Sequence, residues 1–151
     1  MKKLTLMICL LGMTCGSQAQ EYDREYTVKY INDRLSDVCR LFDEKRNLRL
    51  EFYAKGEPVR IDYIFPESVD FEKGVYYSES EKAVIITCYD QAGKCIEREI
   101  LKHGSKIFYD RTNLETDCES ENCQALVNAV RHLIMLYVLD DVERTTPFEE
   151  N

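Results

Sequence analysis

Two pairs of closely spaced cysteines constrain this chain more than any other feature. Cys88 and Cys95 flank the segment YDQAGK, and Cys118 and Cys123 flank ESEN. If residues 90–93 form a hairpin turn, Cys88 and Cys95 face each other across two strands, with Cβ atoms about 4.5–5.5 Å apart, which is close to disulfide distance. The second pair can form a bridge where a loop enters a helix. We therefore expect two local disulfides, Cys88–Cys95 and Cys118–Cys123, with a bridge between Cys39 and one of these cysteines as the alternative.

Metal binding and redox chemistry are the other uses of such cysteines. A zinc site needs four ligands, and a redox pair usually has a C-x-x-C motif at the start of a helix. Only His103 and His132 could join the cysteines as ligands. The acids of DCESENC allow a calcium site, but the segment lacks the glycine and the ligand spacing of an EF-hand loop, and the same acids favour a helix N-terminus. We expect no bound metal and no cofactor.

The first 19 residues have the pattern of a secretory signal peptide. Two lysines precede an apolar run, Leu4–Met13, and Ser17-Gln18-Ala19 offers small residues for cleavage. The run is too short to span a bilayer. This predicts a periplasmic or secreted mature chain, in a compartment where disulfides persist.

A lipid anchor at Cys15 is the alternative. In that interpretation Gly12-Met13-Thr14 would be the lipobox, but Thr14 is a poor residue in front of an acylated cysteine and Gly12 replaces the usual leucine. The cleavage signal that ends at Ala19 is the better match.

Length and charge limit the organisation and the partners. Of the 151 residues, we expect 20–141 to form a single domain and 142–151 a flexible acidic tail. The net charge of −8 becomes −10 without the two N-terminal lysines. Such a chain repels phosphate backbones and anionic lipid surfaces, so nucleic acid is excluded as a partner.

Hydrophobic periodicity predicts an α+β domain with helices at both ends. Apolar residues at helical spacing indicate a helix over Thr27–Phe42, which contains Cys39 as a buried thiol, and a second, deeply buried helix over 123–138. Between them, about six mostly antiparallel strands are expected at 48–54, 59–65, 75–78, 83–89, 95–101 and 106–112. The first two form a hairpin around KGEP. The strand expected at 59–65 has one face that carries Val59, Ile61, Tyr63 and Phe65. The strand expected at 83–89 is apolar on both faces.

No catalytic group stands out. His103 lies in a turn-like segment, LKHGS, without the G-x-S-x-G motif of a serine hydrolase, and His132 is flanked by helix residues. Cys39 falls late in its predicted helix, where nothing lowers the pKa of a thiol. Glu97 and Glu99 share one strand face without a second carboxylate across a cleft, which glycoside hydrolysis requires.

Tyrosines near strand ends and loops form the predicted interaction surface. Amphipathic rings in such places often contact partners, although tyrosine also suits half-buried strands. The four residues are Tyr76, Tyr77, Tyr89 and Tyr109.

The segments YTVKYINDRLSDV, ITCYDQAGKCI and ALVNAVRHLIMLYVLDDVERTTPFEE look like those of small exported domains of the Bacteroidota, of unassigned function. The order of helix, strands and buried C-terminal helix resembles a pleckstrin-homology-like roll, with a cystatin-like helix-on-sheet fold as the alternative. The resemblance implies an interaction scaffold. The basic lipid-binding loop is missing, because the KGEP turn offers only Lys55, with Arg60 beyond it.

The expected function is therefore an exported protein- or peptide-binding module without catalytic activity. An inhibitor or an immunity-type protein is one version of it. The alternatives are a hydrolase of unrecognised type and a structural, lipid-anchored component of the cell envelope.

Overall fold

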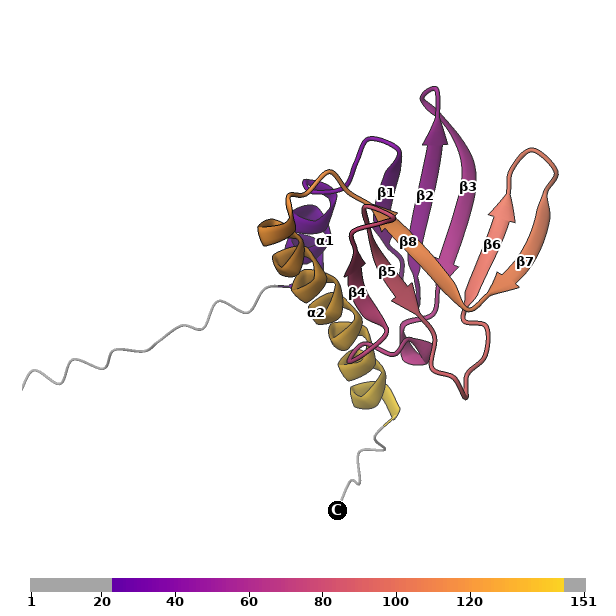
Figure 1. Cartoon of the computed structure of the whole chain (residues 1–151). Coiled ribbons are helices and arrows are strands. Elements are labelled where there is room, and N and C mark those ends of the chain that lie inside the picture. The colour runs from indigo at the N-terminus through magenta and orange to yellow at the C-terminus, as the bar shows by residue number, and fades with distance from the viewer. Residues whose placement is uncertain (1–22, 146–151) are drawn as a thin grey trace, which may run out of the picture.

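The computed structural model describes residues 23–145 and confirms the α+β class (Figure 1). In these residues a helix precedes eight antiparallel strands in two sheets, and a long helix follows them. The elements are α1 (Arg24–Asn32), β1 (Cys39–Asp43), β2 (Leu48–Ala54), β3 (Glu57–Ile64), a 3-10 turn (Pro66–Ser68), β4 (Val75–Ser78), β5 (Ala83–Thr87), β6 (Ile96–Ile100), β7 (Ser105–Tyr109), β8 (Arg111–Glu115) and α2 (Ser120–Thr145). The predicted signal peptide lies outside the described residues.

The larger sheet has the strand order β1-β2-β3-β6-β7, and the smaller one has the order β4-β5-β8. The predicted hairpin around KGEP is present as β2 and β3. The chain then leaves the larger sheet for β4 and β5, returns for β6 and β7, and leaves again for β8. The strands therefore do not follow one another in a single antiparallel series.

The strand count exceeds the prediction of about six for two reasons. A strand, β1, replaces the second half of the predicted first helix, and the segment KIFYDRT divides between β7 and β8. Only Asp110 separates Tyr109 at the end of β7 from Arg111 at the start of β8. The chain thus passes from one sheet to the other within a single residue.

The predicted helix over Thr27–Phe42 is wrong in its second half. Helix α1 ends at Asn32, and its N-cap is Asp23, whose carboxylate accepts a hydrogen bond from the backbone N–H of Tyr26 at 2.8 Å. The Asn32 side chain bonds both backbone groups of Leu41, at 2.7 and 2.8 Å. This contact folds the chain back, so that residues 39–43 pair with β2.

The core lies between the sheets and the helices. It contains the inner side chains of β1, β2 and β3, one face of the smaller sheet, Ile31 of α1 and the buried stripe of α2. Both faces of β5 are buried, as the sequence predicts. Helix α2 packs against α1 and β4, and it continues to Thr145, past the predicted domain end at residue 141. Residues 146–151 of the predicted tail lie outside the description.

Two disulfides join the predicted pairs, with Cα atoms 5.6 Å apart for Cys88–Cys95 and 5.5 Å apart for Cys118–Cys123. The predicted hairpin around the first pair is wrong, because β5 and β6 belong to different sheets. The bridge instead spans the crossover between the sheets. Cys39 is free and buried. These disulfides are consistent with an oxidising compartment such as the periplasm or the cell exterior.

Candidate interaction surface

The β6–β7 hairpin exposes large apolar side chains at the end of the larger sheet. Leu101 in the turn is 36% exposed, and Ile107 and Phe108 of β7 are 49% and 45% exposed. In the part of the chain that the structure describes, β7 pairs with β6 alone, so its other side is an open sheet edge. Figure 1 shows the hairpin projecting beyond the smaller sheet. An edge of this kind can pair with another chain.

The register places the two exposed side chains of β7 on opposite faces. Phe108 lies opposite Glu97 of β6, and Ile107 lies opposite Arg98. On the outer face, Lys106 forms an ion pair with Glu97 at 2.7 Å. The hairpin therefore presents apolar surface on both sides, with a charged pair beside Phe108.

The inner face of the same region contains a buried carboxylate, Asp62 of β3, which is 0% exposed. Arg98 binds it with two hydrogen bonds of 2.7 Å, one to each carboxylate oxygen. Thr112 of β8 donates a further hydrogen bond from the smaller sheet, and Arg60 donates one at 3.2 Å. Such charge-assisted, bidentate pairs are the strong hydrogen bonds of proteins.

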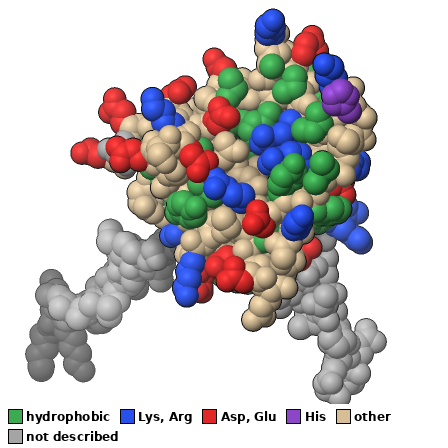
Figure 2. All heavy atoms as spheres, turned by 45° about the vertical axis from the view of Figure 1, so that its right-hand side comes forward, with side chains coloured by type: hydrophobic (Ala, Val, Ile, Leu, Met, Phe, Trp, Pro, Cys, Tyr) green, Lys and Arg blue, Asp and Glu red, His purple; other side chains and the backbone are tan. Residues whose placement is uncertain are grey.

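Arg60 is the partly exposed member of this cluster. Its guanidinium stacks on the ring of Phe52, 3.5 Å from the ring centre, and its side chain is 24% exposed. Burial lowers the pKa of Arg60, and Arg98 lowers it further, against the opposing effect of Asp62. Figure 2 shows the face that includes the hairpin, where hydrophobic side chains lie on both sides of a group of basic ones.

On its own, the alternation of residues in β3 gave no indication of this cluster. Asp62 and Ile64 are buried, whereas Val59 is exposed and Ile61 and Tyr63 are half-buried. The covered face of β3 is therefore the one that carries Asp62 and Ile64, and not the one that carries Val59, Ile61 and Tyr63. Ion pairing to Arg98 makes the burial of Asp62 possible. The alternation of charge and apolar residues in VRIDYIF was the available signal, but it does not say which face is covered.

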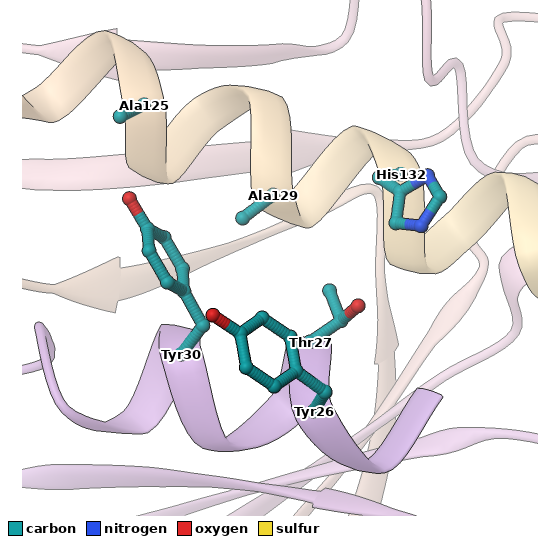
Figure 3. A pocket seen from close by; sticks show the side chains of 6 residues that line it. All are labelled: Tyr26, Thr27, Tyr30, Ala125, Ala129 and His132. Atoms are coloured by element: carbon teal, nitrogen blue, oxygen red, sulfur yellow. The ribbon is translucent and has the colours of Figure 1, made fainter. Parts of the chain in front are cut away.

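A concave surface lies between the two helices (Figure 3). The ring of Tyr30 points from α1 towards α2, and the ring of Tyr26 lies over α1 with its hydroxyl towards Tyr30. Ala125 and Ala129 of α2 leave room between the helices. The cavity has a volume of about 250 Å³. It is lined by Tyr26, Thr27, Tyr30, Ala125, Ala129 and His132. These residues could hold a small apolar group, with hydroxyls and an imidazole at its rim.

The structure does not bring the four predicted tyrosines together on one surface. Tyr76 and Tyr77 are consecutive on β4 and point to opposite faces, and Tyr77 packs against the core. Tyr109 also packs against the core, beneath the guanidinium of Arg98 at 4.2 Å. Tyr89 is exposed in the crossover loop.

The candidate catalytic side chains are also separated. His103 lies in the exposed turn of the β6–β7 hairpin, and His132 lies on α2. Burial raises the pKa of the Cys39 thiol to about 11, so it is protonated at neutral pH. Among the described residues, no three His, Cys, Asp or Glu side chains form a group that could hold a metal ion.

None of the helices within residues 23–145 combines the length and the apolar character needed to cross a membrane. Comparison with models of protein families, with curated proteins and with solved structures found no match to this chain. The resemblance to a pleckstrin-homology-like roll and to exported Bacteroidota domains therefore stays a prediction.

Proposed function

We propose that this chain is an exported module, without catalytic activity, that binds a protein or peptide through the β6–β7 hairpin. One observation carries the proposal: β7 is an open edge strand that exposes Ile107 and Phe108 on its two faces. Edge strands of soluble proteins are usually protected by charges, prolines or bulges. On β7 the single charge, Lys106, is already paired with Glu97. A partner segment that reaches this edge could also pack across the apolar side chains on the inner face of the hairpin.

The rest of the molecule supports a binding role. The Cys88–Cys95 disulfide and a continuous core support the sheet that carries the hairpin, so the surface is held in place before a partner arrives. The raised pKa of Cys39 argues against its use as a nucleophile. An inhibitor or immunity-type protein is one version of this function.

Site-specific photo-crosslinking tests the proposal. A photoreactive side chain at position 108 should crosslink to one recurrent protein in cells that naturally produce the chain. The same group at Met135 of α2, which is 40% exposed, is the matched control. Ile107→Asp should abolish the crosslink from position 108, because a buried carboxylate at the interface costs binding energy.

The proposal fails if positions 108 and 135 give the same adducts, or if Ile107→Asp leaves the adducts unchanged. The reciprocal experiment uses the identified protein as bait. Wild type and Met135→Asp should bind it, and Phe108→Asp should not.

A further inference from the structure

Arg60 occupies an unusual place on the inner face of the larger sheet. The register aligns Phe52, Arg60 and Ile100 across β2, β3 and β6. Ile107 lies opposite Arg98 in the neighbouring row, and it is half exposed. A partly exposed cation thus lies beside apolar side chains on this face of the sheet.

The guanidinium of Arg60 is incompletely paired. Within the described residues it makes one hydrogen bond, to Asp62 at 3.2 Å, whereas Arg98 holds the same carboxylate with two bonds of 2.7 Å. Its Nε lies 3.1 Å from Asp62 but without the alignment of a hydrogen bond. Two guanidinium groups therefore share one carboxylate in direct contact.

A further charged group, Glu115 of β8, attracts the Arg60 guanidinium through space, and within residues 23–145 no hydrogen bond joins the two. The planar guanidinium has five N–H donors, and although its Nε is buried, the Arg60 side chain is 24% exposed, so part of the guanidinium is accessible to a ligand. An added carboxylate would complete its pairing in a setting where the surrounding apolar side chains exclude water.

The chemistry of the site selects the kind of anion. Guanidinium groups bind both phosphates and carboxylates, but the net charge of −8 repels polyanions such as nucleic acid or an anionic membrane. A single carboxylate on an otherwise apolar segment avoids that repulsion and also matches Ile100 and Ile107. The site is therefore complementary to an acidic side chain with apolar neighbours.

We infer that the partner segment carries a Glu or Asp side chain that binds Arg60, with its flanking apolar residues packed on Ile100 and Ile107. This inference rests on the proposed binding function of the hairpin and names the chemistry of the partner. The acidic side chain supplies specificity, and the apolar residues supply most of the buried area.

Selection from a displayed library of random decapeptides tests the inference. The exported chain, with its disulfides oxidised, should select peptides that contain Glu or Asp between apolar residues. Selected peptides are then synthesised with both ends blocked, so that only a side chain can supply the carboxylate. Replacement of the acid by its amide should weaken binding by about tenfold or more, the loss expected for a charge-assisted hydrogen bond.

Arg60→Gln should remove this preference, so that the acidic and the amide peptides bind alike. Arg40→Gln is the matched control, because Arg40 is exposed on the opposite face of the same sheet. Arg60→Lys keeps the charge without the planar donor fork and should retain part of the preference. Thermal unfolding of each variant verifies that it folds.

Three outcomes would overturn the inference. Selected peptides that need Phe108 but show no acidic preference would refute it and leave the proposed function intact. An acidic preference that survives Arg60→Gln would place the carboxylate elsewhere. Self-association of the chain in sedimentation experiments, abolished by Arg60→Gln, would assign the surface to a second copy instead.

Discussion

Thr112 of β8 donates its hydroxyl hydrogen to the buried carboxylate of Asp62 on β3, and thereby links the two sheets through polar atoms. The same carboxylate is bound by Arg98 of β6 at 2.7 Å. One side chain thus connects two neighbouring strands of the larger sheet to the smaller sheet. Its removal should affect the stability of the whole domain.

Asp62→Asn should lower the free energy of unfolding by about 3–5 kcal/mol, because it leaves two arginine side chains without their shared anion. Thr112→Val keeps the shape and removes one hydrogen bond, so it should cost about 1–2 kcal/mol. Urea unfolding at neutral pH measures both values. Equal losses for the two variants would contradict the central role of the carboxylate.

The buried thiol of Cys39 should make stability depend on alkaline pH. Because its pKa in the folded protein is about 11, above the value of an exposed thiol, the unfolded chain loses this proton first as the pH rises. The contribution of Cys39 is fully present below about pH 8.5 and is lost as the pH approaches 11. The free energy of unfolding should therefore fall over this interval, by on the order of 2 kcal/mol.

Cys39→Ala should have a smaller fall over the same interval, and the difference between the two pH profiles isolates the thiol. Tyrosine and lysine ionisation affects both proteins alike. Parallel profiles would show that burial does not hold the thiol in its protonated form.

Removal of either disulfide should destabilise the chain by about 2–3 kcal/mol, as expected for loops this short. Cys88→Ala with Cys95→Ala should increase amide hydrogen exchange at the ends of β5 and β6. Cys118→Ala with Cys123→Ala should do so at the start of α2. If both pairs change exchange at the same amides, the two bridges do not act locally.

Tyr137 joins α2 to the β1–β2 turn. Its hydroxyl donates to Asp43, and burial, together with this bond, raises its pKa. Tyr137→Phe should cost about 1.5–3 kcal/mol, the range for a hydrogen bond to a charged group. Tyr76→Phe, at an exposed tyrosine of β4, should change stability by less than about 0.5 kcal/mol in the same unfolding experiment.

Local patterns made part of the fold predictable. The helical repeat over 123–138 lies within α2, and the alternation in 48–54 and 59–65 corresponds to β2 and β3. Both disulfide pairs were predicted from cysteines close together in the sequence, although the hairpin expected around Cys88–Cys95 is wrong. Each of these features depends on residues that are close together in the sequence.

Features that depend on distant partners could not be predicted. The apolar spacing of Leu35, Val38 and Phe42 is helical, yet residues 39–43 pair with β2 and form β1. Asp62 is buried because Arg98, in another predicted strand, pairs with it. A single sequence does not indicate that these two charges meet.

The candidate surface shows the same limit. Tyrosine is a residue type that is frequent in contact surfaces, but tertiary packing covers much of the surface of Tyr77 and Tyr109. Ile107 and Phe108 are residue types that are frequent in protein cores, but both lie on the edge strand β7 and are exposed. Composition predicts the side chains that can bind, whereas topology decides which remain accessible.

The one-residue connection at Asp110, between β7 and β8, restricts how the β6–β7 hairpin can move. Because a single residue separates β8 from β7, the connection is too short for the hairpin to rotate independently of the smaller sheet. The backbone carbonyl of Asp110 also accepts a hydrogen bond from Cys88 at 2.9 Å, beside the crossover bridge. A force that acts on β7 is thus passed to both sheets, and we expect the hairpin to move together with the smaller sheet and not by itself.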